Sequence, residues 1–338
     1  MATLKEIAAE AGVSMMTISN VINNNHARVS PATEEKVRRI LEKHQYVPNM
    51  AARTLSSRSS RIIALLLPIW HEDAASMLLD PYAGQMVGYL EELLRAKEYY
   101  VMVFSFRDVE QVLTIRRTWQ MDGMILIMPH EDGITRRLIL ESECPLVVLD
   151  RYYEDLKMLS VVIDDRKGGY LATRHLLENG HRDIGYIGSD LNGSSVIHDR
   201  FLGYMDALHE YGIRENSSWF FDHAFHQEGG ERAAQELLHM IHRPSAMVAS
   251  EDLIACGLVR GFQAAGKEVP ESLSVIGFDD SLPARLISPG LTTVGQDIRA
   301  KAELAAEELF HAIKDPSYRD HRSVLEISLT VRQSVSSR

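Results

Sequence analysis

The stretch Thr3-Leu-Lys-Glu-Ile-Ala-Ala-Glu-Ala-Gly-Val-Ser14, continued by Met15-Met-Thr-Ile-Ser-Asn-Val-Ile-Asn23, decides how the chain begins to fold. Apolar residues at helical spacing predict a first short helix over Leu4–Ala11, and Gly12-Val13 predicts a tight turn. Ser14 is a good N-cap for a second helix over Met15–Asn23. Two short helices joined in this way place the start of the second helix where it can enter the major groove of DNA. An ordinary helical hairpin is the alternative interpretation.

A third helix and a linker follow this pair. Ser30-Pro31 forms an N-cap and first-turn pair, and Val37 marks the inward face of the helix behind it. Pro48-Asn49 then interrupts the chain, and Asn49 is placed to cap a short helix over Met50–Leu55. We therefore expect an all-α helix-turn-helix headpiece over 1–48 and a hinge helix with a linker over 49–60, with a flexible tether as the alternative for the latter.

Charge separates this part of the chain from the rest. Residues 1–61 hold nine Lys and Arg against five Glu, a net of +4, whereas the whole chain carries −11. The remainder is therefore strongly acidic, at −15. An asymmetry of this kind is typical of a protein in which one element meets phosphates and the body does not.

From Arg61 onward, apolar strands alternate with helical patterns, which predicts parallel sheets flanked by helices. The length favours two doubly wound α/β lobes, the first over about 61–162 and 294–322, the second over about 163–293 and 323–338. Buried strands are expected at Ile62–Leu67, Tyr100–Phe104, Met124–Met128, Leu146–Leu149, Ile184–Ile187, Ala246–Ala249 and Ser274–Ile276, and a last strand at Ser323–Val331.

Composition narrows the cellular setting. The N-terminus has no uninterrupted apolar run, and the longest such run, Ile62–Trp70, is interrupted by Pro68, so neither a signal peptide nor a membrane span is predicted. Cys144 and Cys256 lie far apart without CxxC spacing, which predicts neither a disulfide framework nor a zinc site. We expect a cytoplasmic protein without a metal or other cofactor.

Several motifs resemble the lac repressor/galactose repressor family. They include Tyr46-Val-Pro-Asn49 with Ala52-Arg53-Thr-Leu55, Pro145-Leu-Val-Val-Leu-Asp150-Arg151, His175-Leu-Leu-Glu-Asn-Gly180-His181-Arg182, Arg200-Phe-Leu-Gly203-Tyr204, and Ser274-Val-Ile-Gly277-Phe278-Asp279-Asp280, besides the opening stretch. The resemblance covers nearly the whole chain. It implies a helix-turn-helix headpiece, a hinge helix and a two-lobed periplasmic-binding-protein-like core, in agreement with the alternation of strands and helices.

The resemblance also implies which residues meet DNA. Met15, Met16 and Asn20 would touch base edges. Because Asn can form a bidentate bond to adenine, whereas a Met side chain can only pack against a thymine methyl, Asn20 predicts an adenine in the operator. Alternatively, Met15 or Met16 fills the headpiece core. The residues implied at the DNA are Ser14, Met15, Met16, Thr17, Ser19, Asn20 and Asn23, with Thr17 and Ser19 on phosphates.

The stretch Met50–Leu55 is much shorter than the roughly 12 to 15 residues that an isolated helix needs to be even marginally stable in water. By resemblance, this helix pairs with its twin from a second subunit and pushes Leu55 into the minor groove, with Asn49 and Arg53 beside it. Unstacking a base step costs a few kcal/mol, which the contacts of the bent site must offset.

For the core, the resemblance implies an effector cleft containing Tyr82, Arg200, Phe225, Glu251 and Asp279. Arg200 and Asp279 supply donors and acceptors for hydroxyls or ring polar atoms, and Tyr82 and Phe225 supply stacking faces. The alternatives are a structural ion pair for Arg200 and Asp279, and core packing for the two rings. Glu251 stands where a sugar-binding relative has Asn, so it favours a polyol or cationic ligand or points away from the cleft.

The function predicted is a DNA-binding regulator, a repressor controlled by a sugar or related polar metabolite. Its partners are a pseudo-palindromic double-stranded operator, the effector and a second copy of the chain, since no heptad leucines follow the last strand to join a tetramer. The alternatives are a solute-binding protein or a regulator that responds to a nucleobase or a phosphoprotein. The sequence contains no GxSxG, P-loop, HExxH or dinucleotide motif, so an enzyme is not expected.

Overall fold

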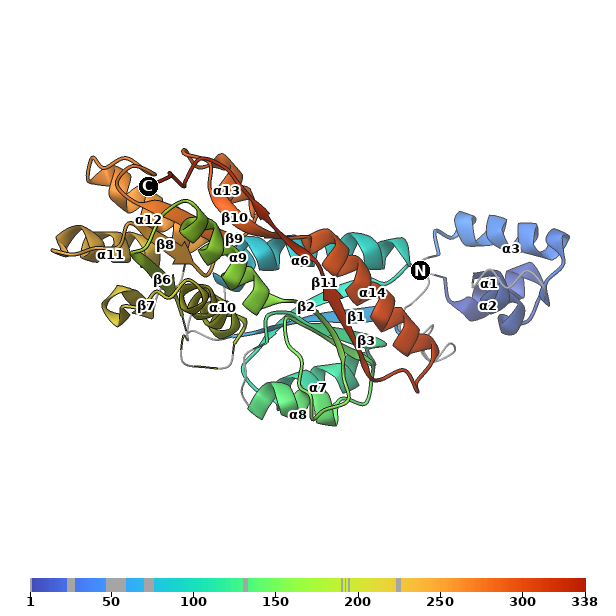
Figure 1. The fold of residues 1–338 in the computed structure, drawn as a ribbon. Coiled ribbons are helices and arrows are strands. Elements are labelled where there is room, and N and C mark those ends of the chain that lie inside the picture. Colours follow the sequence, from blue (N-terminus) through green and yellow to red (C-terminus); the bar gives the residue numbers. More distant parts are fainter. Residues whose placement is uncertain are drawn as a thin grey trace. The chain divides into compact units, whose positions relative to one another are not determined.

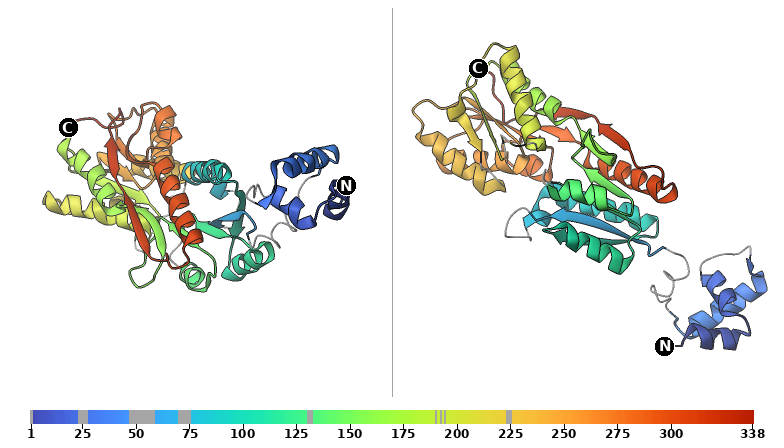
Figure 2. Two further views of the ribbon diagram at one scale, coloured as in Figure 1. Left: turned by 90° about the vertical axis from the view of Figure 1, so that its right-hand side faces the viewer. Right: turned by 90° about the horizontal axis from the view of Figure 1, so that it is seen from below.

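A computed structural model of the chain divides into two compact units, Met1–Ser60 and Arg61–Arg338, which we call the headpiece and the core (Figures 1 and 2). The structure describes residues 2–22, 28–46, 59–69, 76–129, 133–189, 191, 193, 195–222 and 226–338. Each unit has a hydrophobic core of its own.

The described residues of the headpiece form three helices: α1 (Leu4–Ala11), α2 (Met15–Ile22) and α3 (Pro31–Lys43). Thr3 and Glu6 form a capping box at the start of α1, which satisfies the free N–H groups there. Gly12 ends α1 in the left-handed conformation, with φ of 64°, which is why the chain can turn sharply into α2. The buried side chains of this cluster are Ile7, Ala8, Ala11, Ile18, Val21 and Val37.

The first lobe of the core is built on a six-stranded, wholly parallel sheet. Its strands, in spatial order, are β11 (His321–Leu325), β5 (Leu159–Ile163), β4 (Leu146–Leu149), β3 (Gly123–Leu126), β1 (Ile62–Pro68) and β2 (Tyr100–Phe106). One face packs on α6 (Pro81–Ala96) and α14 (Ile298–Lys314), and the other on α7 (Val109–Trp119) and α8 (Gly133–Glu141) (Figure 1). The short α5 (Ser76–Leu79) precedes α6.

The second lobe repeats this plan. Its strands, in spatial order, are β12 (Ile327–Thr330), β10 (Thr292–Gln296), β9 (Ser274–Asp279), β8 (Ala246–Ala249), β6 (Ile184–Gly188) and β7 (Phe220–Asp222), of which β12 alone is antiparallel to its neighbour. Its helices are α9 (Asp165–Glu178), α10 (Val196–Glu210), the 3₁₀ turn Ser217–Trp219, α11 (His226–His239), α12 (Asp252–Ala264) and α13 (Leu282–Leu286). The predicted architecture, an all-α headpiece with two doubly wound α/β lobes, is confirmed.

The chain passes between the two lobes three times. It crosses between β5 and α9, between β10 and α14, and between β11 and β12, where a single residue, Glu326, separates the strands. The expectation of one strand over Ser323–Val331 is therefore wrong, because the two halves of that segment pair with different sheets. The second crossing falls after Gln296 and the third at Glu326, a few residues beyond the positions expected at 293 and 322.

Within the described part of the chain, none of the helices has the length and apolar character needed to cross a membrane. Over the same residues, no group of three or more His, Cys, Asp and Glu side chains is arranged to hold a metal ion.

Candidate functional site

The N-terminal end of α2 presents an unusual surface. Ser14 accepts a hydrogen bond from the Thr17 backbone N–H at 3.1 Å, as the predicted N-cap should. Met15 and Met16, which follow directly, are 57% and 69% exposed. The alternative in which one of them fills the headpiece core is therefore wrong: Ile18 and Val21 provide the buried face of this helix.

The remaining residues expected at the DNA fall into two groups. Thr17, Ser19 and Asn20 are half-buried on α2, beside the exposed methionines. Four others lie outside the described residues: Asn23, Asn49, Arg53 and Leu55. The expected hinge helix over Met50–Leu55 also lies outside them.

In the core, a cavity of about 400 Å³ lies between the lobes. The strands end at its walls, as expected for a ligand site in parallel α/β sheets. Its first-lobe lining is Pro68, Ile69, Asp80, Tyr82, Phe106, Arg107, Met128, Pro129, Ile134, Thr135 and Asp150; its second-lobe lining is Ser189, Ser195, Val196, Ile197, Arg200, Glu251, Asp279 and Gln296. Four of the five expected cleft residues, namely Tyr82, Arg200, Glu251 and Asp279, thus share one cavity, and Phe225 lies outside the described residues.

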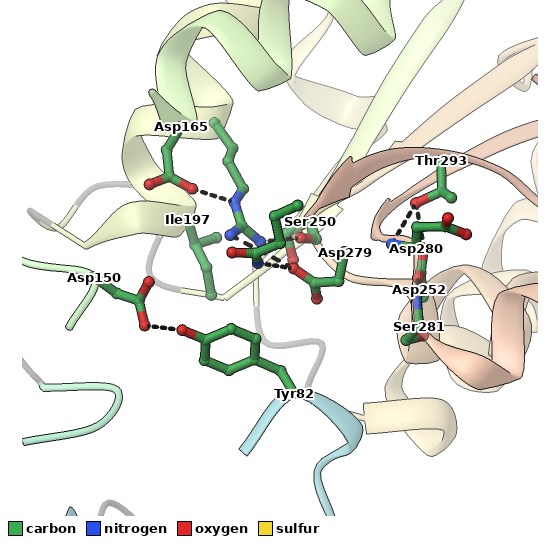
Figure 3. Close-up of polar contacts among 12 residues, drawn as sticks. Tyr82, Asp150, Asp165, Ile197, Ser250, Asp252, Asp279, Asp280, Ser281 and Thr293 are labelled. Atoms are coloured by element: carbon green, nitrogen blue, oxygen red, sulfur yellow. Dashed lines mark hydrogen bonds and ion pairs between the residues drawn. The ribbon is translucent and has the colours of Figure 1, made fainter. Parts of the chain in front are cut away.

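Arg200 is the central cation of the second-lobe wall and is only 6% exposed. Its Nε donates to Asp165 Oδ1 at 2.8 Å, and its Nη1 donates to the Ser250 carbonyl at 2.7 Å. The guanidinium also stacks on the Phe278 ring, with 3.6 Å from Cζ to the ring centroid. A backbone carbonyl, an acid and a ring thus fix the guanidinium in one orientation. Figure 3 shows Asp165 and Ser250 on this group.

Asp279 faces the same guanidinium at a longer distance. Its Oδ1 lies 3.9 Å from Arg200 Nη2 and accepts a hydrogen bond from Gln296 Nε2 at 2.6 Å. Burial raises the pKa of the Asp279 carboxyl well above its ordinary value, and Asp252 and Glu251 raise it further while Arg200 opposes the change. Arg200 and Asp279 thus form an ion pair at long distance, and the close acidic partner of Arg200 is Asp165.

Glu251 is the residue before α12, where a side chain usually caps the helix. Its side chain makes no such bond to the helix and lines the cavity. Burial raises the pKa of Glu251 to about 7, and the neighbouring carboxylate of Asp80 adds to the shift. This carboxyl group is accordingly placed to meet a ligand.

Tyr82 is held by a polar cluster in the first lobe. Its hydroxyl donates to Asp150 Oδ2 at 2.5 Å (Figure 3). Lys301 Nζ donates to Asp150 Oδ1 at 2.6 Å. The Tyr82 ring therefore lines the cavity while its hydroxyl is occupied by Asp150. Burial and the Asp150 charge raise the pKa of Tyr82 well above its ordinary value, so the phenol stays protonated.

Asp165, Asp150, Gln296 and Lys301 were not predicted from the sequence as site residues. Asp165 follows Asp164 in an acidic pair with no local signal of a site, and Asp150 lies in the family-like stretch Pro145–Arg151, which does not by itself assign it a role. Lys301 lies in a helix where a lysine normally faces water. Only the tertiary fold brings Asp150 and Gln296 to the cavity lining and places Asp165 and Lys301 on the residues that line it.

Comparisons with known proteins agree with this geometry. The family model described as "Bacterial regulatory proteins, lacI family" matches residues 3–49, and the one described as "Periplasmic binding protein-like domain" matches residues 173–335. A ribose operon repressor of Haemophilus influenzae is 33% identical, covering 100% of this chain and 99% of its own. The HTH-type transcriptional regulator DegA of Bacillus subtilis is 32% identical, covering 99% of this chain and 98% of its own.

Solved structures show the same fold. A complex of the transcriptional regulator CelR with cellobiose has a TM-score of 0.74 at 29% identity, covering 99% of this chain and 100% of that one. The lac repressor dimer bound to operator and the anti-inducer ONPF has a TM-score of 0.86 at 24% identity, covering 99% of both chains, and supports the fold alone. The headpiece, the two-lobed core and full-length relatives above 30% identity lead to one conclusion: this chain belongs to the lacI family of bacterial regulatory proteins and is a DNA-binding transcriptional regulator with a ligand-binding core.

Proposed function

We propose that this protein is a repressor whose affinity for operator DNA is controlled by a small polar effector bound between the lobes. The observation that carries the proposal is the convergence of Tyr82, Arg200, Glu251 and Asp279 on one cavity of about 400 Å³. This volume lies within the range typical of small-molecule sites. A DNA-binding regulator must share a compartment with the chromosome, so we propose that it acts in the cytoplasm.

The chemistry of the cavity favours a hydroxylated ligand such as a sugar. Arg200 offers fixed donors, Asp279 and Glu251 offer acceptors for hydroxyl groups, and the Tyr82 ring offers a flat apolar face. Among the relatives, one is described as a ribose operon repressor, and a solved structure is described with bound cellobiose. These descriptions support testing sugars first.

A thermal-shift screen of the full chain tests the effector. The panel consists of pentoses, hexoses, disaccharides, amino sugars, polyols and nucleobases, because a ligand that binds only the folded state raises the melting temperature by mass action. We expect a sugar to raise the melting temperature and to change operator affinity by roughly 5- to 150-fold. If Arg200→Met still binds that sugar as tightly, the cleft is not its site.

For DNA, we propose that α2 reads the operator through Met15, Met16 and Asn20. The exposed side chains of Met15 and Met16 support this, because neither of them packs in the core of the headpiece. Selection of binding sites from random DNA should yield a pseudo-palindrome with an adenine where Asn20 reads. An invariant guanine in register with Asn20 would contradict the proposal.

A second copy of the chain is the proposed partner. Strand β2 lies at the edge of the first sheet with Tyr100 and Val103 exposed, and α13 exposes Leu282 and Leu286 in the second lobe. An exposed apolar edge strand invites pairing with another chain. Light scattering should show a dimer for the wild type and a monomer for Val103→Lys with Leu286→Lys. Ile241→Lys, at a residue that is 93% exposed on the same lobe as α13, is the control that should stay dimeric.

A further inference from the structure

Lys301 is a buried cation that the proposed function does not use. It lies on α14, in the first lobe, and its side chain is 0% exposed. Its Nζ donates to three acceptors: Asp150 Oδ1 at 2.6 Å, Gln296 Oε1 at 2.5 Å and the Tyr82 hydroxyl oxygen at 3.4 Å. These acceptors come from three different segments, and all three line the cavity.

The contacts to Asp150 and Tyr82 fix the first-lobe wall. Lys301 occupies one oxygen of Asp150, and the Tyr82 hydroxyl occupies the other. The ammonium also lies 5.2 Å from the centroid of the Tyr82 ring. The place of the ring therefore depends on the Asp150 carboxylate, which Lys301 holds.

The contact to Gln296 reaches the second-lobe wall. Gln296 ends β10, directly before the chain crosses into α14. Its Oε1 accepts from Lys301, and its Nε2 donates to Asp279 Oδ1 at 2.6 Å. An amide has one accepting and one donating end, so the ammonium on one side and the carboxylate on the other determine its orientation.

We propose that Lys301 is a positioning residue for both walls of the effector cavity: through Asp150 it holds Tyr82, and through Gln296 it holds Asp279. The proposal rests on the assignment of the cavity as the effector site. It adds that the two lobes are linked at this point by a continuous polar chain, Tyr82–Asp150–Lys301–Gln296–Asp279. A change at one wall therefore alters the other wall.

Stability alone does not account for this arrangement. Removing two charges from water offsets most of their attraction, so a buried ion pair adds little net stability over apolar residues of similar size. What distinguishes Lys301 is its geometry, since one group engages acceptors on both sides of a lobe crossing.

A double-mutant cycle without any ligand tests the link. Lys301 and Asp279 have no direct bond. If Lys301 acts only within its own lobe, Lys301→Met and Asp279→Asn should each change the unfolding equilibrium constant of the full chain by the same factor alone and together. We expect instead that Lys301→Met changes the effect of Asp279→Asn by about threefold or more, because Gln296 no longer holds its orientation. Independent effects would overturn the proposal.

Two variants keep the test interpretable. Lys314→Met, at the exposed end of the same helix, should combine independently with Asp279→Asn. If Lys301→Met fails to fold because the Asp150 charge is left without Lys301, the combined change Lys301→Met/Asp150→Asn, which leaves no unpaired charge, replaces Lys301→Met in the cycle with Asp279→Asn.

Crystal structures of the same variants give a second readout. Without the ammonium, the Tyr82 ring should move and the Gln296 amide should leave Asp279. If both side chains keep their positions, the proposal is wrong. Neither readout uses an effector. A failure of the sugar screen would therefore count against the proposed function and would not affect the test of the link through Lys301.

Discussion

Arg200, on α10, pairs with Asp165 at the start of α9, with 2.8 Å between Nε and Oδ1. This acid balances the buried guanidinium from behind the cavity wall. The second acid near Arg200, Asp279, lies at 3.9 Å and lines the cavity. Asp165 holds Arg200 closely, and Asp279 lies farther from it. The Arg200 guanidinium is therefore the fixed donor of the site, and the Asp279 carboxyl is an acceptor at the cavity.

Replacing Asp165 should weaken both the fold and the site. Asp165→Asn removes the charge that balances Arg200 while retaining the shape of the side chain, so we expect a loss of about 1–3 kcal/mol in the free energy of unfolding. Urea unfolding of the full chain measures it. Asp199→Asn, an exposed acid beside Arg200, is the control and should change stability by only a few tenths of a kcal/mol. Equal effects of the two changes would contradict the role given to Asp165.

The approach of α10 to α9 can be tested at Gly169. A Cβ there would lie 1.8 Å from the Arg200 carbonyl oxygen, so Gly169→Ala must push apart the two helices that carry the ion pair. We expect a loss of more than about 2 kcal/mol in thermal or urea unfolding, together with weaker effector binding. Gly88→Ala, in α6 with open space around it, should instead stabilise the chain by up to about 1 kcal/mol.

Glu251 should make stability depend on pH. Its pKa is about 7 in the folded chain and ordinarily 4.5, so the folded state holds this proton more tightly than the unfolded state. The free energy of unfolding should therefore fall as pH rises from about 4.5 to 7, and Glu251 is most destabilising above that window. Glu251→Gln should raise stability at pH 8 by roughly 1–3 kcal/mol and change it little at pH 4.5. An unchanged pH profile would contradict this.

The family resemblance gives a prediction for Leu55, which lies outside the described residues. If Leu55 enters the minor groove at the operator centre, Leu55→Ala should weaken operator binding much more than binding to random DNA. Gel-shift titrations at one salt concentration measure the ratio. A uniform loss on both DNAs would instead indicate a phosphate contact near this position.

Local signals made the headpiece predictable. Gly12, Ser14 and Ser30 each act within a few residues of chain, and the structure places a helix end at each of them. Strands β1, β3, β4, β6, β8 and β9 were recognisable as short apolar runs. The expectation of a buried strand at Tyr100–Phe104 is wrong, because β2 lies at the edge of its sheet with Tyr100 and Val103 exposed. Strand β5 is buried but was not expected. Strand β10, with its Thr-Thr-Val-Gly-Gln sequence, has no such run, and its strand conformation depends on pairing with β9 and β12.

Only some residues of the cleft could be predicted from the sequence. Arg200 and Asp279 stood in motifs that resemble the family, so they could be named from sequence. Their partners Asp165 and Gln296 could not, because those contacts join residues 35 and 17 positions apart in the chain. The same holds for Lys301, which is 151 positions from Asp150. No local pattern separates this lysine from one on a helix surface.

The three crossings between the lobes affect how such a protein can be recombined. Neither lobe is a single uninterrupted piece of the chain, so no one cut-and-join event can exchange one lobe for that of a relative. The headpiece, in contrast, ends before Arg61 and joins the core once. A gene fusion at that junction replaces the headpiece and keeps the whole effector cavity.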